Sequence, residues 1–244
     1  MQKKRITKKI RQDLIPLLKT YAFIKVWHAS CSAGQEVYSM SILLEEEGMK
    51  SRSQIYTTDF NELVLEKAKN GIYPLEAMKT YTSNYQQSGG ENDFSDYYTA
   101  DYDHVILRQS LKERILFSSH NLVTDGVFGE MNLIFCRNVL IYFNRQLQNR
   151  VLRLFYDSLC PGGYLCLGSK ESLKFTDLED KFEPVAGREK IYRKNGSHEK
   201  KKIHSDCNWG ICGGSFCPYR HTAKSFGPSR PADPHCSAFK AGLR

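Results

Sequence analysis

Three short segments of strand-forming composition each lead into residues suited to ligand binding or catalysis. The segment 23–27 is followed by a loop of small residues, and the segment 54–58 is followed by an aspartate, Asp59. The segment 131–136 runs directly into an Arg-Asn pair, which the packing of a core does not require. Small residues let a backbone approach a ligand closely, and a carboxylate can accept hydrogen bonds from two hydroxyl groups. These residue types together fit a nucleotide-like ligand.

The loop 29–34 reads Ala-Ser-Cys-Ser-Ala-Gly and holds a single glycine, Gly34. It lacks the three glycines of a dinucleotide fingerprint, so a pyrophosphate is poorly accommodated there. Asp59 lies 25 residues after Gly34, where an acid can hold ribose hydroxyls. An aspartate at a strand end is more often a turn or helix-cap residue. Glu36, in the first turn of the next helix, either holds a cationic ligand group or compensates the helix dipole.

Helical and strand patterns alternate along most of the chain. Apolar periodicity predicts helices over 10–18, 35–48, 62–70 and 145–159, and composition predicts strands over 23–27, 54–58, 114–118, 131–136, 164–167 and 191–193. This alternation is typical of an α/β fold with a mainly parallel sheet. Ligands of such sheets bind outside the carboxyl ends of the strands. We therefore expect Asp59, Arg137 and the loop 29–34 to lie at one edge of the sheet.

The net charge of the 244 residues is +8, but it is concentrated at the two ends. Residues 1–13 carry a net charge of +5, residues 195–244 carry another +5, and the middle carries −2. A strongly basic protein would suggest nucleic acid or an anionic membrane as its partner. Because the part predicted to fold is near neutral, we expect no nucleic-acid partner.

Export and membrane insertion are not expected. No apolar run approaches the roughly 18 residues that span a bilayer, and the basic N-terminus lacks the apolar region of a signal peptide. We expect a cytoplasmic protein and a monomer. Four cysteines in or beside apolar stretches are expected to be buried reduced thiols: Cys31, Cys136, Cys160 and Cys166.

Beyond these patterns, the sequence resembles a known family. The motifs that carry the resemblance are Trp27–Ser39 (WHASCSAGQEVYS), 58–60 with 64–68 and 71–73, Asn121-Leu122, Cys136–Phe143 (CRNVLIYF) and 161–173. In this order they are similar to the motifs of chemotaxis protein methyltransferases of the CheR type, over about 14–194. The resemblance implies the catalytic domain of that family: a Rossmann-like class I methyltransferase sheet with helices on both faces.

The resemblance also predicts how the chain is divided. We expect a basic linker helix over 1–20 and an S-adenosylmethionine-dependent methyltransferase domain over 21–194, with the family's N-terminal helical domain largely absent. The segment 73–108 falls where the family inserts a small subdomain, and a plain surface excursion is the other interpretation. The basic residues 1–13 are either part of a receptor-facing surface or a solvated helix start.

The resemblance implies a specific reaction, in which S-adenosylmethionine methylates glutamate carboxylates on chemoreceptor helices. A sulfonium cation and a carboxylate lose charge together, so a water-poor site that aligns them does most of the work. No metal or strong base is required, because a glutamate is already ionised near neutral pH.

The site residues follow from the matched motif positions. Ala29 and Glu36 would line the methionine end of the cofactor, Asp59 would hold the ribose, and Asn121 and Leu122 would flank the adenine. Arg137, Asn138 and Tyr142 would face the reacting centre. Phe60, Arg137 and Asn138 are also expected to bind the cofactor. As catalytic residues, Arg137 would steer the substrate carboxylate and Tyr142 would position the sulfonium methyl. Spacing alone also allows Tyr142 to be a half-buried core aromatic.

The sequence departs from the family at several positions. Ser30, Gln35 and Val37 replace a glycine or alanine, an acid and a proline, and the Phe-Phe-Arg segment of the N-terminal domain has no counterpart. Losing one positioned charged donor costs about 10²–10³ in rate. The alternative function is therefore a catalytically impaired module that binds S-adenosylmethionine and docks to a signalling partner. A nucleotide-dependent oxidoreductase is disfavoured by the single glycine of the loop and by Arg137-Asn138.

The last fifty residues differ from the rest in composition. They contain Cys207, Cys212, Cys217 and His221, whose last part resembles a Cys₃His zinc spacing. They are also rich in glycine and proline and show almost no apolar periodicity. We expect a disordered extension over 195–244, with zinc binding as the alternative.

Overall fold

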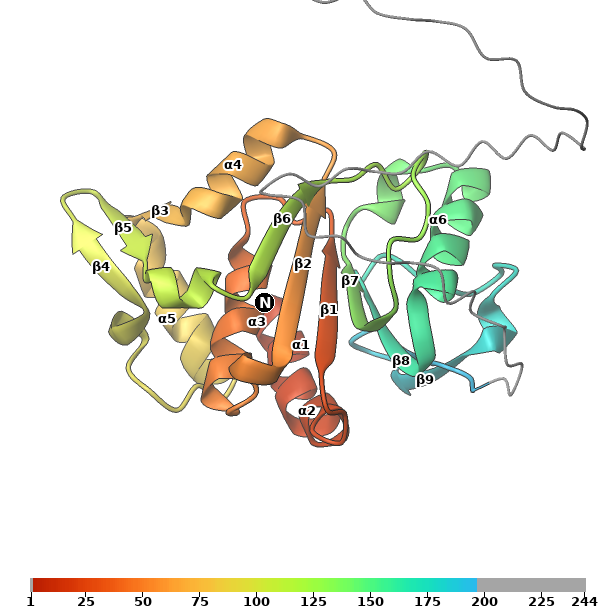
Figure 1. The fold of residues 1–244 in the computed structure, drawn as a ribbon, viewed down its shortest axis with the longest axis horizontal. Coiled ribbons are helices and arrows are strands. Elements are labelled where there is room, and N and C mark those ends of the chain that lie inside the picture. Colours follow the sequence, from red (N-terminus) through yellow and green to blue (C-terminus); the bar gives the residue numbers. More distant parts are fainter. Residues whose placement is uncertain (1, 197–244) are drawn as a thin grey trace, which may run out of the picture. The chain divides into compact units, whose positions relative to one another are not determined.

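A seven-stranded sheet forms the centre of the protein in the computed structural model, which describes residues 2–196, with side chains from Arg5 onward (Figure 1). The strand order is β6-β2-β1-β7-β8-β10-β9. Their bounds are β1 Ile24–Ala29, β2 Ser53–Asp59, β6 Ile115–Ser119, β7 Met131–Cys136, β8 Leu159–Leu167, β9 Phe182–Ala186 and β10 Ile191–Lys194. The first five strands in this order are parallel, and β10 is antiparallel to both of its neighbours.

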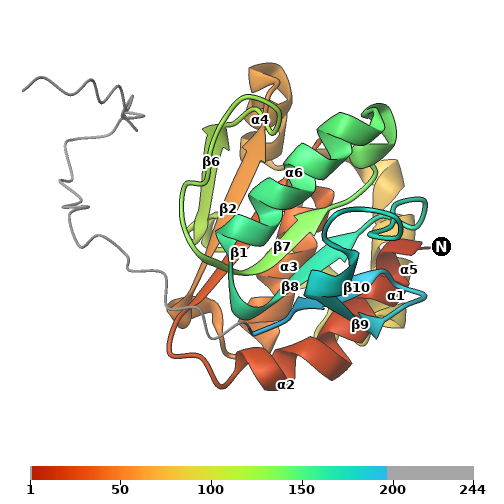
Figure 2. The same ribbon diagram turned by 90° about the vertical axis from the view of Figure 1, so that its right-hand side faces the viewer.

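Helices cover both faces of this sheet, as Figures 1 and 2 show. Their bounds are α1 Gln2–Lys9, α2 Ile15–Leu18, α3 Gln35–Glu46, α4 Glu62–Asn70, α5 Met78–Gln87 and α6 Arg145–Ser158, and a π-helical turn, Ile10–Leu14, joins α1 to α2. The predicted α/β class with helices on both faces is therefore confirmed.

Alternation along the central strands divides the core in two. In β7, Leu133 and Phe135 pack with residues of α2 and α3, while Ile134 and Cys136 pack with residues of α6. All six residues of this strand are buried, as expected for a parallel strand covered on both sides. Such a strand has no polar face, so its sequence is a continuous apolar run.

The first helical segment belongs to the same compact unit as the sheet. Leu14, Ile15 and Leu18 are each at most 1% exposed and lie in the core cluster that also holds Ile24 of β1. The segment we expected as a linker helix therefore forms part of the core on this face.

A second, smaller sheet lies in the segment 72–107. Its strands are β3 Ile72–Pro74, β4 Tyr98–Asp101 and β5 His104–Leu107, in the antiparallel order β3-β5-β4. Helix α5 lies between β3 and β4 in the chain and contacts α1. The segment 72–107, called the small subdomain below, therefore has a sheet of its own.

Two features of the sheet were not predicted. Strand β9 was missed because Pro184 lies in its middle, and an edge strand tolerates proline since one side of its backbone needs no hydrogen-bond partner. Strand β8 begins at Leu159, well before the predicted start at 164.

The four cysteines in the described part of the chain are all free thiols. Cys31, Cys136 and Cys166 are buried as predicted, whereas Cys160 is half-buried. Within 2–196, no helix has the length and apolar character that would let it cross a membrane.

Candidate functional site

The predicted site residues follow four neighbouring parallel strands. Asn121 and Leu122 come after β6, Asp59 ends β2, Ala29 ends β1 and Arg137 follows β7. The register pairs Ala29 with Thr58 and Asp59 with Ser119, so these strand ends are level. The chain leaves β1 through α3 to reach β2 on one side, while β7 lies on the other side of β1. The arrangement is a topological switch point, where ligands of α/β sheets bind.

Asp59 holds the loop that follows β1. Its Oδ2 accepts hydrogen bonds from the Ser30 hydroxyl and the Ser32 backbone N–H, both at 3.2 Å, and its Oδ1 accepts from the Asn61 backbone N–H at 3.2 Å. Ser30 and Ser32 have left-handed backbones, at φ 65° and 51°. The turn role that we kept open for Asp59 is therefore present, and its two oxygens keep lone pairs for further hydrogen bonds.

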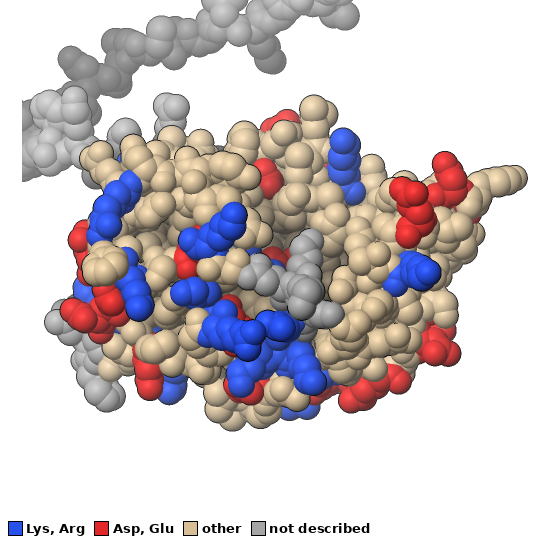
Figure 3. Space-filling view, turned by 180° about the vertical axis from the view of Figure 1, so that it is seen from behind, with Lys and Arg blue, Asp and Glu red and all other residues tan. Residues whose placement is uncertain are grey.

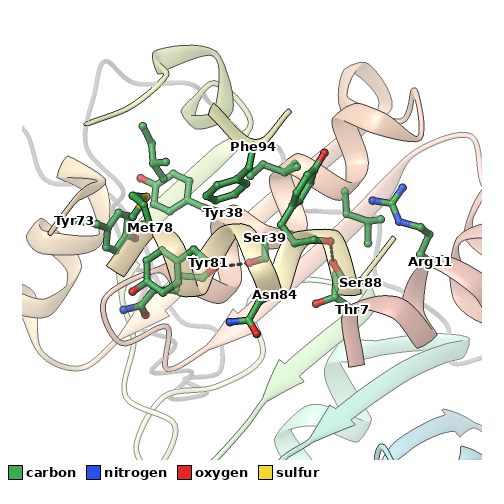
Figure 4. Close-up of a pocket in the computed structure, with 15 residues that line it drawn as sticks. Thr7, Arg11, Tyr38, Ser39, Tyr73, Met78, Tyr81, Asn84, Ser88 and Phe94 are labelled. Atoms are coloured by element: carbon green, nitrogen blue, oxygen red, sulfur yellow. Dashed lines mark hydrogen bonds between the residues drawn. The ribbon is translucent and has the colours of Figure 1, made fainter. Parts of the chain in front are cut away.

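The small subdomain contacts the same loop through Tyr73. The Tyr73 hydroxyl donates to the Ala33 carbonyl at 2.7 Å, and the Tyr73 ring lies edge-on to Tyr38 of α3 and to Tyr81 of α5. These tyrosines line a pocket between α1, α3 and α5, which Figure 4 shows. The loop between β1 and α3 is thus fixed both by Asp59 and by a tyrosine of the subdomain.

Gly34 ends this loop and must remain a glycine. Its φ is +82°, and a Cβ built on it would lie 3.0 Å from the Cβ of Ala68 in α4. The left-handed backbone and the close approach of α4 both exclude a side chain.

Arg137 and Glu36 form an ion pair across 101 residues of sequence. Their side chains are 7% and 26% exposed, and the Arg137 Nε is buried without a hydrogen-bond partner among the described residues. Glu36 lies in the first turn of α3, where a carboxylate also compensates the helix dipole. The sequence interpretation gave the two residues separate ligand roles, whereas the structure joins them directly.

Glu171 fixes the loop that carries Arg137 and Asn138. Its buried carboxylate accepts four backbone N–H groups: from Asn138 at 3.1 Å, Val139 at 2.7 Å, Leu140 at 2.8 Å, and Gly168. This carboxylate ties the loop after β7 to the loop after β8, and it holds Asn138 in a left-handed backbone at φ 61°.

Sequence reasoning missed the roles of Glu171 and Gly168, although both lie in a motif quoted for the resemblance. A Cβ on Gly168 would lie 2.6 Å from a Glu171 carboxylate oxygen and 2.8 Å from the Asn138 nitrogen. The sequence signal was an acid between two leucines, Leu167 and Leu173, which the structure shows to be buried. A carboxylate in an apolar segment is expected to be buried, and a buried carboxylate needs several hydrogen-bond donors.

Two of the predicted site residues have largely exposed side chains. Phe60 is 74% exposed and Tyr142 is 80% exposed. The interpretation of Tyr142 as a half-buried core aromatic is therefore wrong. Asn121 is exposed and its Oδ1 accepts from the Val123 backbone N–H at 2.9 Å, while Leu122 is buried.

His28 is buried directly beneath the site. Its ring stacks on Phe135 at 4.5 Å between centroids, and its Nε2 has no hydrogen-bond partner among the described residues. Burial, and secondarily the positive charge of Arg137, lowers the pKa of His28 to about 3.

We expect His28 to make the protein less stable as pH falls below about 6.5. The unfolded chain then binds a proton that the buried imidazole does not accept until about pH 3, so the free energy of unfolding falls by up to about 1.4 kcal/mol per pH unit. Between pH 6 and pH 4.5 this amounts to about 2 kcal/mol. Urea unfolding of wild type and His28→Leu at both pH values measures it. An equal loss in both proteins would contradict the assignment.

No cluster of three or more metal-binding side chains occurs within residues 2–196. The residues whose spacing suggested a zinc site lie outside the part of the chain that the structure describes: Cys207, Cys212, Cys217 and His221. Most of the extension expected over 195–244 also lies outside it.

Comparison with known proteins identifies the family. Residues 2–191 match the family model described as CheR methyltransferase, SAM binding domain. The chain belongs to the CheR methyltransferase family. This confirms the resemblance that the motifs indicated.

Two relatives are similar to most of this chain. "Putative methyltransferase Cher3" of Pseudomonas putida is 51% identical over 186 residues, which are 76% of this chain and 68% of that protein. A chemotaxis protein methyltransferase of Vibrio anguillarum is 37% identical over 168 residues, 66% of this chain and 58% of that protein. The chain therefore spans only a little over half the length of the Vibrio CheR protein.

Among solved structures, the S-adenosylmethionine-dependent methyltransferase SibL in its apo form matches with a TM-score of 0.37 and 15% identity, over 64% of this chain and 34% of that one.

Proposed function

We propose that this CheR-family domain transfers a methyl group from S-adenosylmethionine to glutamate carboxylates of chemoreceptor proteins, on their cytoplasmic helices. One observation carries the proposal: the residues that family motifs assign to cofactor and substrate follow four neighbouring strands, at the switch point of the sheet. The names of the relatives support methyl transfer in chemotaxis.

The residues at the strand ends fit S-adenosylmethionine. Asp59 keeps acceptor capacity for ribose hydroxyls, and the loop 30–34 brings backbone close to a ligand through its left-handed residues. The Nε–H of Arg137 is a buried donor without a hydrogen-bond acceptor among the described residues, and a ligand carboxylate could accept from it. Asn121 and Leu122 would flank the adenine. When bound, the cofactor supplies an electrophilic methyl group.

The protein's own contribution is positioning of the reacting groups. Arg137 would orient the acceptor carboxylate, and Glu36 holds the guanidinium of Arg137 in place through their ion pair. The carboxylate needs no proton removed, so no general base is assigned. Tyr142 is exposed and lies two residues after the loop segment 138–140, whose backbone Glu171 binds. We assign it to contact with the incoming acceptor and the methyl group.

Tyr142→Phe tests this assignment because the exposed hydroxyl makes no hydrogen bond with the described residues. We expect at least about a tenfold loss of methyl transfer, unchanged stability and unchanged cofactor affinity. The measurement is incorporation of labelled methyl groups from S-adenosylmethionine into receptor fragments, with calorimetric binding of S-adenosylhomocysteine alongside.

Methyl incorporation by the wild-type protein distinguishes the proposed reaction from the alternative function, a catalytically impaired module that binds S-adenosylmethionine and docks to a signalling partner. Cofactor binding without any methyl incorporation would reject the enzyme and leave the binding function. Equal incorporation by wild type and Tyr142→Phe would remove the hydroxyl from the mechanism.

A further inference from the structure

A second pocket lies beside Arg137, on the face that carries α1. It is lined by Arg5 of α1, by Arg137 after β7, by Leu167 at the end of β8 and Ser169 beyond it, and by Arg188 and Glu189 of the turn between β9 and β10. Figure 3 shows lysine and arginine side chains gathered in the middle of this face. Three segments far apart in the sequence thus place three guanidinium groups around one hollow.

The positive charge of this pocket is only partly compensated. Glu36 pairs with Arg137, and Glu189 is the single carboxylate in the lining. Arg5 and Arg188 are exposed, and neither makes a hydrogen bond or ion pair with another described residue. Bringing like charges together costs free energy that a bound anion would recover.

Arg137 supplies an independent indication of a ligand. Its side chain is 93% buried, since 7% is exposed, and its Nε has no acceptor among the described residues. Buried donors in folded proteins nearly always have an acceptor, and charged donors most of all. The acceptor missing from the described part of the chain is therefore expected from a ligand in the pocket that Arg137 lines.

We infer that this pocket binds a carboxylate, with Arg137 at its inner end and with Arg5 and Arg188 as binding residues that confer specificity for the negative charge. Planar guanidinium groups match carboxylates in two-point hydrogen bonding. The inference rests on the proposed function, because two carboxylates belong to that reaction: the methionyl carboxylate of S-adenosylmethionine and the glutamate of the acceptor protein.

Two pairs of probes distinguish these sources. Calorimetry compares S-adenosylmethionine with decarboxylated S-adenosylmethionine, and separately a glutamate-bearing receptor fragment with its glutamine counterpart in the presence of S-adenosylhomocysteine. The proteins are wild type, Arg188→Ala, Arg5→Ala, and Arg153→Ala as a matched control, since Arg153 is exposed on α6. We expect wild type and the control to prefer the carboxylate-bearing probe, and each pocket variant to lose about tenfold in affinity for it.

The outcome identifies the carboxylate. If a pocket variant loses the preference for S-adenosylmethionine over its decarboxylated form, the pocket binds the methionyl carboxylate. If it loses the preference for the glutamate-bearing fragment over the glutamine counterpart, the pocket binds the acceptor carboxylate. If both pocket variants keep both preferences, the inference is overturned.

A probe without cofactor separates this inference from the proposed function. If wild type binds neither S-adenosylmethionine nor receptor fragment, the proposed function fails. Glutarate is then titrated while the Nε–H resonance of Arg137 is followed. A shift that is present in wild type and lost in Arg188→Ala supports the pocket, and no shift in wild type overturns it.

Discussion

Replacing Glu171 with alanine is expected to lower the free energy of unfolding by about 3–5 kcal/mol. The carboxylate is buried and accepts four backbone N–H groups, and alanine leaves all of them without their acceptor. Because the same bonds hold the loop of Arg137 and Asn138, affinity for S-adenosylmethionine should fall as well. Urea unfolding and calorimetry measure the two effects.

Glu171→Gln and Glu179→Ala are the matching variants. Glutamine keeps one carbonyl oxygen, so its loss of stability should be smaller than that of alanine. Glu179 is exposed and accepts a single backbone N–H, from Phe175 at 2.7 Å, so Glu179→Ala should cost less than about 1 kcal/mol. If Glu171→Ala costs no more than Glu179→Ala, the carboxylate does not hold the two loops together.

Arg137→Met is expected to lower kcat/KM for methyl transfer by about 10²–10³. The guanidinium is the one charged donor that the structure places at the end of β7, held by Glu36 and with a free Nε. Arg137→Lys should retain part of the activity, because lysine keeps the charge but not the planar fork of donors. Initial rates of methyl incorporation at several concentrations of receptor fragment measure both variants.

Arg153→Met is the control for Arg137→Met, and it should leave kcat/KM unchanged. Glu36→Gln removes the ion-pair partner while keeping the guanidinium, so its loss should lie between those of wild type and Arg137→Met. Retention of full activity by Arg137→Met would exclude the guanidinium from substrate positioning, whatever the cause of its burial.

Much of the fold could be predicted from local patterns. The helices at 35–46 and 62–70 and the strands at 24–29 and 131–136 follow from periodicities that depend only on neighbouring residues. Strand β9 could not be predicted in this way. A proline usually argues against a strand, and only its position at the sheet edge makes Pro184 acceptable there.

The site could be predicted in part, for a related reason. Parallel strands end at one edge of a sheet, so Asp59 and Arg137 could be placed together from chain order alone. The hydrogen bonds from three consecutive backbone N–H groups to Glu171 could not be predicted, because they depend on how the loop after β8 packs on the loop after β7. Nor did the sequence indicate that Asp59 would hold Ser30 and Ser32.

The α/β class, the family and the residue types at the strand ends follow from the amino-acid sequence alone. Those features are local or collinear, and hydrophobic periodicity and motif order express them directly. Which charges become neighbours depends on the three-dimensional packing: Glu36 pairs with Arg137, and Arg5 and Arg188 line the same pocket as Arg137. Side chains from distant segments become neighbours only when a core is packed, and the free energy of a charge depends on those neighbours.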